Sequence, residues 1–211
     1  MHIQLLGYSI PIFIFLSMLV IILFTCMITV LYIVLVIVIA CSVSLIFWTI
    51  KNKISPMPSS RAARTAVLTA VKEIVNDPEV EPVVVEPGSG WGTLTVPIAR
   101  RLPQCRVIGH ENSPVPFLFS RLRGWIAGCN NLRITKQDFT KADLHGAGII
   151  VCFLHPAGMN TVRTLLHTGT SGSTVYVVSN TFRLHGYEPC KSYPIHDVYN
   201  SEVFVYRLLF A

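Results

Sequence analysis

The sequence predicts an α/β domain in which helices cover both faces of a mostly parallel sheet, preceded by an N-terminal membrane segment. Two observations lead to this prediction. Between residues 51 and 211, short apolar strands alternate with helical stretches, which is typical of a parallel sheet. Residues 1–50 contain no Asp, Glu, Lys or Arg. We therefore expect a membrane anchor over 1–50, a juxtamembrane joint over 51–60 and one folded domain over 61–211.

The expected elements of the folded domain follow one another in a regular order. A helix over 61–75 precedes the first strand, which starts at Val83. Further strands are expected at 106–110, 132–135, 149–153 and 175–179, with helices between them at 93–102, 114–127 and 159–166. The tail changes period and gives two strands, 188–195 and 202–209, joined through 197–201. We expect this pair to be antiparallel and to close the sheet.

The apolar segment is longer than one membrane span requires. Residues 12–50 form a run of 39 residues without charge, Gly or Pro, whereas one span needs about 20. Two arrangements fit: a hairpin of two short spans that meet between Thr25 and Thr29, or one span with an apolar extension. The length favours the hairpin slightly. A cleavable signal peptide fits badly, because no positive charge precedes the run and the run is too long.

Basic residues follow the apolar run directly, at Lys51, Lys53, Arg61 and Arg64. Positive flanks face the cytoplasm, so the folded domain is expected on the cytoplasmic side of the membrane or, in a mitochondrion, on the matrix side. These charges either contact anionic headgroups or are simply solvated.

The first strand runs into a glycine-rich turn with Gly88, Gly90 and Gly92, and Glu86 stands two places before the first glycine. Alternate glycines let the backbone approach a ligand closely, and the carboxylate can hold a cation. That combination suits the amino acid end of S-adenosylmethionine. The third glycine falls one place early for a dinucleotide fingerprint, and no lysine follows as in a P-loop. The alternative is a glycine-rich turn without a ligand.

Two more strand ends supply candidate ligands. Glu111 follows the strand at 106–110, about 20 residues past the glycine turn, where a carboxylate can accept both hydroxyls of a ribose. Asn112 is a candidate assistant. Asp138 and Phe139 follow the next strand and can offer adenine an acceptor and an apolar wall. Asp138 can equally be a helix N-cap or a solvated loop charge.

These three motifs resemble those of the class I S-adenosylmethionine-dependent methyltransferases. Three further segments resemble the small membrane-anchored protein-lysine methyltransferases that modify ATP synthase c-subunits or the adenine nucleotide carrier. They are residues 55–60, residues 177–182 with 186–189 after them, and residues 203–207. The resemblance implies a Rossmann-like sheet of seven strands, S-adenosyl-L-methionine as the cofactor, and a joint that folds over it. It also implies protein-lysine methylation as the activity.

One segment departs from the patterns of related enzymes. Methyltransferases that act on adenine or glutamine carry Asp/Asn-Pro-Pro-Tyr where this chain has His155 and Pro156 after the strand at 149–153. The difference argues against a nucleic-acid or glutamine methylase, and it leaves no obvious catalytic residue. Because a sulfonium methyl is already activated, positioning a neutral nucleophile supplies much of the rate. His155, His110 and His185 are candidate proton acceptors, but structural histidines are more common, and no base is assigned.

The sequence therefore predicts a membrane-tethered methyltransferase that N-methylates a lysine of a membrane protein. The alternatives are a phospholipid or other lipid methyltransferase, and an inactive cofactor-binding scaffold. The expected partners are the bilayer and a membrane-protein substrate. Nucleic acid is not expected, because the basic residues lack aromatic interleaving. A metal is not expected either, because the six cysteines contain no Cys-x-x-Cys pair.

Overall fold

The computed structural model describes residues 2–5, 8–52, 57–144, 146–169, 174–195 and 200–209. Residues 53–56 of the expected joint, Lys53 included, and residues 197–199 of the expected tail connection lie outside this part of the chain. The structure divides into two units, Met1–Phe47 and Trp48–Ala211, and each is described by itself.

The N-terminal unit consists of a short hairpin and most of one long helix. Strand β1 (His2–Leu5) pairs antiparallel with β2 (Tyr8–Pro11). Helix α1 (Ile12–Asn52) is 41 residues long and none of its residues is buried. By length and composition it is able to cross a membrane.

Helix α1 is continuous, so the slightly preferred hairpin between Thr25 and Thr29 is not present. The Thr25 hydroxyl donates to the carbonyl of Ile21 at 2.8 Å, and the Thr29 hydroxyl donates to that of Thr25 at 2.9 Å. Both hydroxyls are thus satisfied inside the helix. Without Gly or Pro to break the pattern, the helix continues.

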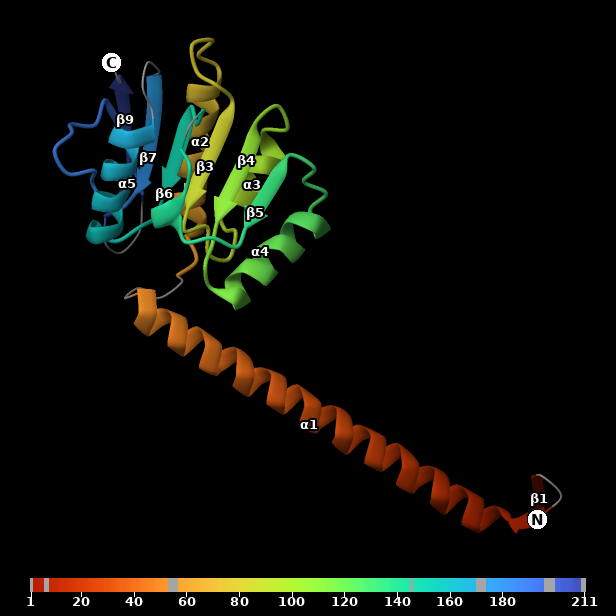
Figure 1. The fold of residues 1–211 in the computed structure, drawn as a ribbon. Coiled ribbons are helices and arrows are strands. Elements are labelled where there is room, and N and C mark those ends of the chain that lie inside the picture. Colours follow the sequence, from red (N-terminus) through yellow and green to blue (C-terminus); the bar gives the residue numbers. More distant parts are fainter. Residues whose placement is uncertain are drawn as a thin grey trace. The chain divides into compact units, whose positions relative to one another are not determined.

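The second unit holds a seven-stranded sheet with the order β5-β4-β3-β6-β7-β9-β8 (Figure 1). The strands are β3 (Val83–Pro87), β4 (Arg106–His110), β5 (Leu132–Thr135), β6 (Ile149–Cys152), β7 (Thr174–Asn180), β8 (Lys191–Pro194) and β9 (Glu202–Leu209). The first five are parallel to one another, and β9 runs antiparallel between β7 and β8. The expected antiparallel closing pair is therefore confirmed.

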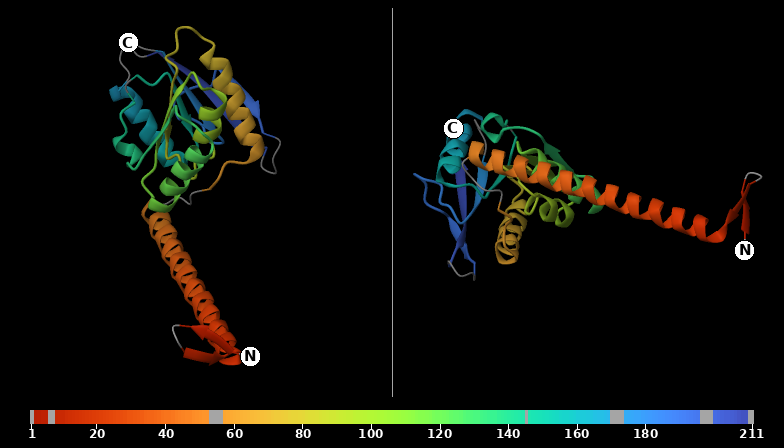
Figure 2. Two further views of the ribbon diagram at one scale, coloured as in Figure 1. Left: turned by 90° about the vertical axis from the view of Figure 1, so that its right-hand side faces the viewer. Right: turned by 90° about the horizontal axis from the view of Figure 1, so that it is seen from below.

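Helices cover both faces of the sheet, as two further views show (Figure 2). They are α2 (Arg61–Val75), α3 (Thr95–Arg101), α4 (Pro114–Ile126) and α5 (Pro156–Gly169), together with the short 3-10 helix η1 (Phe139–Lys141). Side chains of α2 and α3 pack in one apolar cluster and those of α5 in another. Successive strand residues alternate between the two clusters, because Val84 belongs to the first and Val85 to the second.

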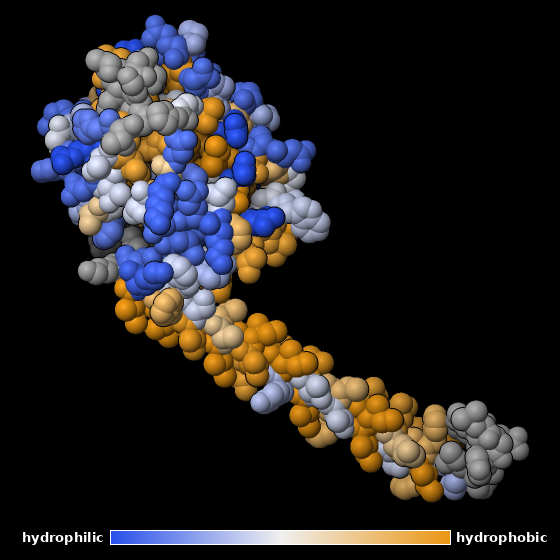
Figure 3. All heavy atoms as spheres, viewed as in Figure 1, coloured by the Kyte–Doolittle hydropathy of each residue, from blue (hydrophilic) through white to orange (hydrophobic). Residues whose placement is uncertain are grey.

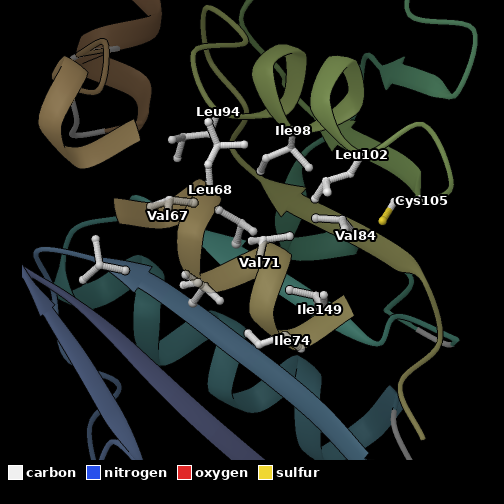
Figure 4. Close-up of a cluster of buried hydrophobic side chains, with 14 of the residues drawn as sticks. Val67, Leu68, Val71, Ile74, Val84, Leu94, Ile98, Leu102, Cys105 and Ile149 are labelled. Carbon is white, nitrogen blue, oxygen red and sulfur yellow. The ribbon is translucent and has the colours of Figure 1, made fainter. Parts of the chain in front are cut away.

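The larger cluster forms where α2 and α3 lie against the sheet (Figure 4). Ser60 caps α2 by accepting a hydrogen bond from the Ala63 amide at 3.1 Å. Val67 and Val71, one turn apart, are fully buried, which is the spacing of one helical face. The N-cap and this apolar face together account for the agreement between α2 and the helix predicted over 61–75.

Two helix starts differ from the prediction for local reasons. Helix α5 begins at Pro156, earlier than the expected 159, because proline suits the first helical position. Helix α3 covers Thr95–Arg101 and contains Pro97 in its first turn, where the missing N–H has no intrahelical partner to lose.

A buried hydroxyl joins β9 to the loop after β7, and it gives a test of the fold. Tyr206 is fully buried and its hydroxyl accepts a hydrogen bond from the Leu184 amide at 3.0 Å. We expect Tyr206→Phe to lower the free energy of unfolding by about 1–3 kcal/mol, because it leaves a buried N–H without an acceptor. Tyr187→Phe is the control, since its hydroxyl contacts His167 in an exposed place. Denaturant unfolding of the two variants should separate them, and equal losses would contradict this account.

Candidate functional site

A cavity of about 870 Å³ lies at the carboxyl ends of the parallel strands. Residues at or just after the ends of β3, β4, β6 and β7 line it, among them Glu86, His110, Leu154 and Asn180. Ligands of open α/β sheets bind at this edge, where neighbouring loops diverge. The cavity is therefore where a ligand of this domain is expected.

The glycine turn forms one wall of the cavity through two of its three glycines. Gly88, Gly90 and Gly92 have φ angles of 69°, 50° and 67°, a left-handed conformation that favours glycine. Gly88 and Gly90 line the cavity. Gly92 instead packs against α4, because a Cβ at this position would lie 3.0 Å from the Cβ of Ser120. The structure thus gives the third glycine a packing role in place of the predicted contact.

Glu86 is a buried carboxylate at the end of β3, with 3% of its surface exposed. Its Oε2 accepts a hydrogen bond from the Thr95 amide at 2.9 Å. Burial raises the pKa of Glu86 well above its usual range, the Thr95 amide opposes this, and the charge of Glu111 raises it further. Within the described residues, no Lys or Arg forms an ion pair with it. The environment therefore favours a cationic ligand beside Glu86.

Glu111 joins the glycine turn to the start of α4. Its Oε2 accepts a hydrogen bond from the Gly90 amide at 2.8 Å, and its Oε1 accepts one from the Ser113 amide at 2.7 Å. A carboxylate oxygen has two lone pairs, so each oxygen keeps one for a ligand hydroxyl. Glu111 lines the cavity, and its predicted contact with a ribose stays a prediction.

Asn112 pairs with a residue that the sequence did not single out. Asn52, the last residue of α1, donates to the Asn112 amide oxygen at 3.0 Å, and Asn112 donates back to that of Asn52 at 3.1 Å. Trp48, Lys51 and Asn52 all line the cavity. The only sequence signal for this contribution is that Lys51 and Asn52 are the first strongly polar side chains after the apolar run.

The joint also reaches the cavity. The amide of Ser59 donates to the Thr93 hydroxyl at 3.2 Å, which places the residues before α2 beside the glycine turn. Residues 57–60 line the cavity. Only the family resemblance predicted this position of the joint, and its residues 53–56 lie outside the described part.

Asp138 and Phe139 both line the cavity, and their predicted contact with adenine stays a prediction. Asp138 also accepts a hydrogen bond from the Thr140 amide at 3.0 Å and is the N-cap of η1. The capping alternative is therefore confirmed, and the same residue faces the cavity. Phe139 is half-buried and packs against the apolar cluster that includes α5.

The three candidate histidines differ in position. His155 lines the cavity and its Nδ1 accepts a hydrogen bond from the Gly158 amide at 3.3 Å, so Nε2 carries the proton of the neutral ring. His110 is buried against the Thr135 hydroxyl, and burial lowers its pKa. His185 is exposed and does not line the cavity. None of them presents an evident base to the cavity, and no base is assigned.

The residues at the end of β7 form another wall of the cavity. They belong to a segment that resembles the family, but the sequence indicated no role for them. Asn180 is 2% exposed, and Thr181 has a φ of 71°. This left-handed conformation is costly for a β-branched residue, about 1–3 kcal/mol. The Thr181 amide donates to the Glu202 carbonyl at 2.9 Å, which holds the turn in place. Phe182 stacks on Phe153 with ring centroids 6.4 Å apart, and both rings line the cavity.

Solved methyltransferases share this fold. An RNA methyltransferase from Salinibacter ruber, in complex with S-adenosyl-L-homocysteine, is 21% identical, with a TM-score of 0.57 over 72% of this chain and 94% of its own. TYW2 from P. horikoshii, in complex with MeSAdo, is 15% identical, with a TM-score of 0.54 over 74% and 66%. Magnesium protoporphyrin IX methyltransferase from Synechocystis PCC 6803, with bound SAM, is 12% identical, with a TM-score of 0.52 over 71% and 80%. The fold is that of the class I methyltransferases, as the motifs predicted.

The family follows from a match to residues 86–191, which begins at Glu86 and makes up half of the chain. These residues match the model of the ANTKMT methyltransferase domain, and the chain belongs to this family. A search of curated protein sequences found no match. The narrower family that the segments at 55–60, 177–182 with 186–189, and 203–207 suggested is thus confirmed.

The buried carboxyl of Glu86 gives a pH-dependent test of its environment. Its raised pKa means that the folded state keeps a proton that the unfolded state loses above about pH 4.3. Stability therefore falls as pH rises from the unfolded pKa towards the folded one. We expect Glu86→Gln to be more stable than the parent at pH 7.5 and equal to it below about pH 4, measured by thermal unfolding.

Glu73→Gln is the control with the opposite sign. The hydrogen bonds from Lys191 and Tyr193 lower the pKa of Glu73, so its contribution is present above the unfolded pKa and is lost in acid. This variant should be no more stable than the parent at pH 7.5. A Glu86→Gln variant that loses stability at that pH would show that Glu86 is not a desolvated, uncompensated carboxyl.

Proposed function

We propose that this chain is a membrane-anchored methyltransferase that transfers a methyl group from S-adenosyl-L-methionine to a lysine of a membrane protein. The observation that carries the cofactor assignment is Glu86, a buried carboxyl that forms no ion pair with any Lys or Arg of the described residues. The ammonium of the methionine portion supplies the missing positive charge. The residues of the cavity therefore fit this cofactor.

Each remaining part of the cofactor has a partner in the cavity. The main chain at Gly88 and Gly90 lies along the methionine portion, where left-handed glycines allow close approach. Glu111 accepts the ribose hydroxyls through its remaining lone pairs, with Asn112 beside it. Asp138 accepts from the adenine amino group, and Phe139 packs against the ring. We leave Gly92 out of this set because it packs against α4.

The acceptor side of the cavity suits an amine. When bound, the cofactor supplies an activated methyl on a sulfonium sulfur. The rings of Phe153 and Phe182 line the cavity beside Asn180. Aromatic faces attract an ammonium group, so they favour entry of a lysine side chain. Since no base is assigned, the lysine ammonium loses its proton to solvent. Positioning of the neutral amine beside the methyl group then supplies much of the rate.

The anchor supports a membrane substrate. Helix α1 contains residues 12–50 without a charge, and Lys51 follows directly. The positive flank supports a position of the folded domain on the cytoplasmic side, or on the matrix side of a mitochondrial membrane. An enzyme confined to a bilayer meets membrane partners at a raised effective concentration. This confinement supports a membrane-protein substrate rather than a soluble one.

Calorimetry of cofactor binding tests the role of Glu86. At pH values below its raised pKa, binding of S-adenosyl-L-homocysteine should release a proton, because the ligand ammonium favours the carboxylate. The affinity should therefore increase with pH and level off above that pKa. Titrations in buffers of different ionisation enthalpy measure the released proton.

Glu86→Gln should remove this proton release and weaken binding by at least about tenfold, as expected for the loss of a charge-assisted hydrogen bond. Glu79→Gln is the matched control, because Glu79 is an exposed carboxylate that pairs only with Arg207 among the described residues. Unchanged binding by the Glu86 variant would contradict the assignment.

Transfer of labelled methyl groups to isolated membranes tests the substrate. Membranes from cells that lack this gene product are incubated with the full chain and labelled cofactor, then divided into protein and lipid fractions. We expect the label in protein, on lysine by mass spectrometry, and none with Glu86→Gln. Label in the lipid fraction would identify a lipid methyltransferase instead. Absence of label with cofactor bound would indicate an inactive scaffold.

A further inference from the structure

Helix α4 exposes its large apolar side chains. Seven large hydrophobic residues are exposed in the described part of 57–209, and five of them lie on α4: Leu118, Phe119, Leu122, Trp125 and Ile126. Trp125 is 79% exposed. Their spacing of three and four residues places them on one side of the helix. Apolar residues gather over α4 in the space-filling view (Figure 3).

The orientation of α4 is fixed by the small residues on its other face. Pro116, Ser120 and Gly124, each one turn apart, are its buried residues. A Cβ on Gly124 would lie 2.9 Å from the Leu132 side chain, and a Cβ on Gly92 would lie 3.0 Å from Ser120. Only small side chains fit at this close approach to β5 and the glycine turn. The apolar face is therefore turned outward by packing, and an exposed patch of this kind marks an interaction site.

The segment of the sequence that contains α4 is rich in positive charge. Residues 88–136 contain seven Lys and Arg and a single acidic residue, Glu111. Glu111 is 7% exposed and accepts two backbone hydrogen bonds, so it contributes little to the surface. Arg121 lies on α4 with its guanidinium 5.6 Å from the Phe117 ring centroid. An apolar face with tryptophan at its side and arginines around it is typical of helices that lie in the headgroup region of anionic bilayers.

The start of α4 is hydrogen-bonded to the end of the apolar helix. Asn52 donates to the side chains of Asn112 and Ser113 at 3.0 and 3.3 Å, and Ser113 is the N-cap of α4. Helix α4 has 13 residues and extends about 20 Å at 1.5 Å per residue. The apolar run ends at Ile50, so α4 begins where a membrane span would leave the hydrocarbon.

We propose that the outer face of α4 inserts into the headgroup region of an anionic bilayer and forms a second membrane contact of the domain. The proposal rests on the proposed function only in taking α1 as a membrane anchor. Two membrane contacts, through α1 and α4, fix the orientation of the domain relative to the membrane. A single helix followed by a joint leaves the domain free to rotate. Ser113, the N-cap of α4, also lines the cavity. This orientation therefore holds the cavity close to the membrane surface. The substrate lysine is then one that lies near the headgroups.

Fluorescence of Trp125 in vesicles tests this contact. The full chain carries three tryptophans, so Trp48→Phe with Trp91→Phe leaves Trp125 as the reporter. The protein is reconstituted into vesicles of phosphatidylcholine and phosphatidylglycerol with brominated acyl chains, which quench only at short range. We expect strong quenching of Trp125, and weaker quenching when phosphatidylglycerol is omitted.

The matched control moves the tryptophan to the opposite end of the sheet. Glu79 precedes the amino end of β3 and its side chain is 70% exposed. Glu79→Trp, combined with phenylalanine at all three native tryptophans, should show little quenching in the same vesicles. Equal quenching at the two positions would overturn the proposal. Shielding of Trp125 only after a membrane protein is co-reconstituted would also overturn it, and would identify a protein-docking face.

A charge on the apolar face gives a second measurement. Leu122 is 50% exposed, so Leu122→Glu should leave the unfolding midpoint and the binding of S-adenosyl-L-homocysteine unchanged. It should reduce quenching of Trp125 severalfold and reduce methyl transfer to membranes. Full quenching of Trp125 in this variant would contradict the proposal.

Extraction of membranes with alkaline carbonate tests the α1 anchor separately from the α4 contact. A chain that resists extraction while Trp125 stays unquenched retains the anchor and loses the α4 contact. A chain that is extracted lacks the anchor of the proposed function, and quenching before extraction still decides the α4 contact. Quenching without methyl transfer supports the α4 contact and contradicts the proposed activity.

Discussion

The site depends on the hydrogen bonds that the carboxylate of Glu111 accepts. This carboxylate accepts them from the amides of Gly90 and Ser113, and so it fixes the glycine turn against the first residues of α4. These two amides belong to a turn and a helix start, which otherwise have no backbone partners. Asn112 lies between Glu111 and Ser113 and pairs with Asn52. One carboxylate therefore sets the cofactor wall, the direction of α4 and the contact with the end of α1.

The site also carries costs that the rest of the fold offsets. Glu86 is buried beside a second carboxylate, and Thr181 is held in a left-handed conformation. Both are unfavourable in the free protein. The Thr95 and Glu202 backbone groups hold them in place. Such costs persist where the surrounding structure over-determines them and where a ligand relieves them. Their location at the end of β3 and the end of β7 is consistent with the proposed cofactor and acceptor positions.

Helices α1 and α4 share one feature, because both leave large apolar side chains exposed. No residue of α1 is buried, and α4 buries only Pro116, Ser120 and Gly124. In water these surfaces are unfavourable. In the proposed arrangement a bilayer covers both surfaces, with α1 in the hydrocarbon and α4 at the headgroups. The proposed substrate, a lysine of a membrane protein, is reached in the same geometry.

The sequence by itself determined most of the elements, the parallel sheet and the candidate residues Glu86, Glu111 and Asp138. Strand periods, glycine spacing and acidic residues at strand ends depend on neighbours in the chain, which is why these could be predicted. Two features depended on contacts between distant residues: Gly92 packs on Ser120, and Asn52 pairs with Asn112. The continuity of helix α1 is instead a local property, because its Thr hydroxyls bond within the helix and no Gly or Pro interrupts it. In the sequence, the spacing of the apolar residues of α4 predicts a helix face that is buried in the core. Only the tertiary structure shows that the space beside Leu132 and Gly92 admits small side chains alone, which turns the large ones outward.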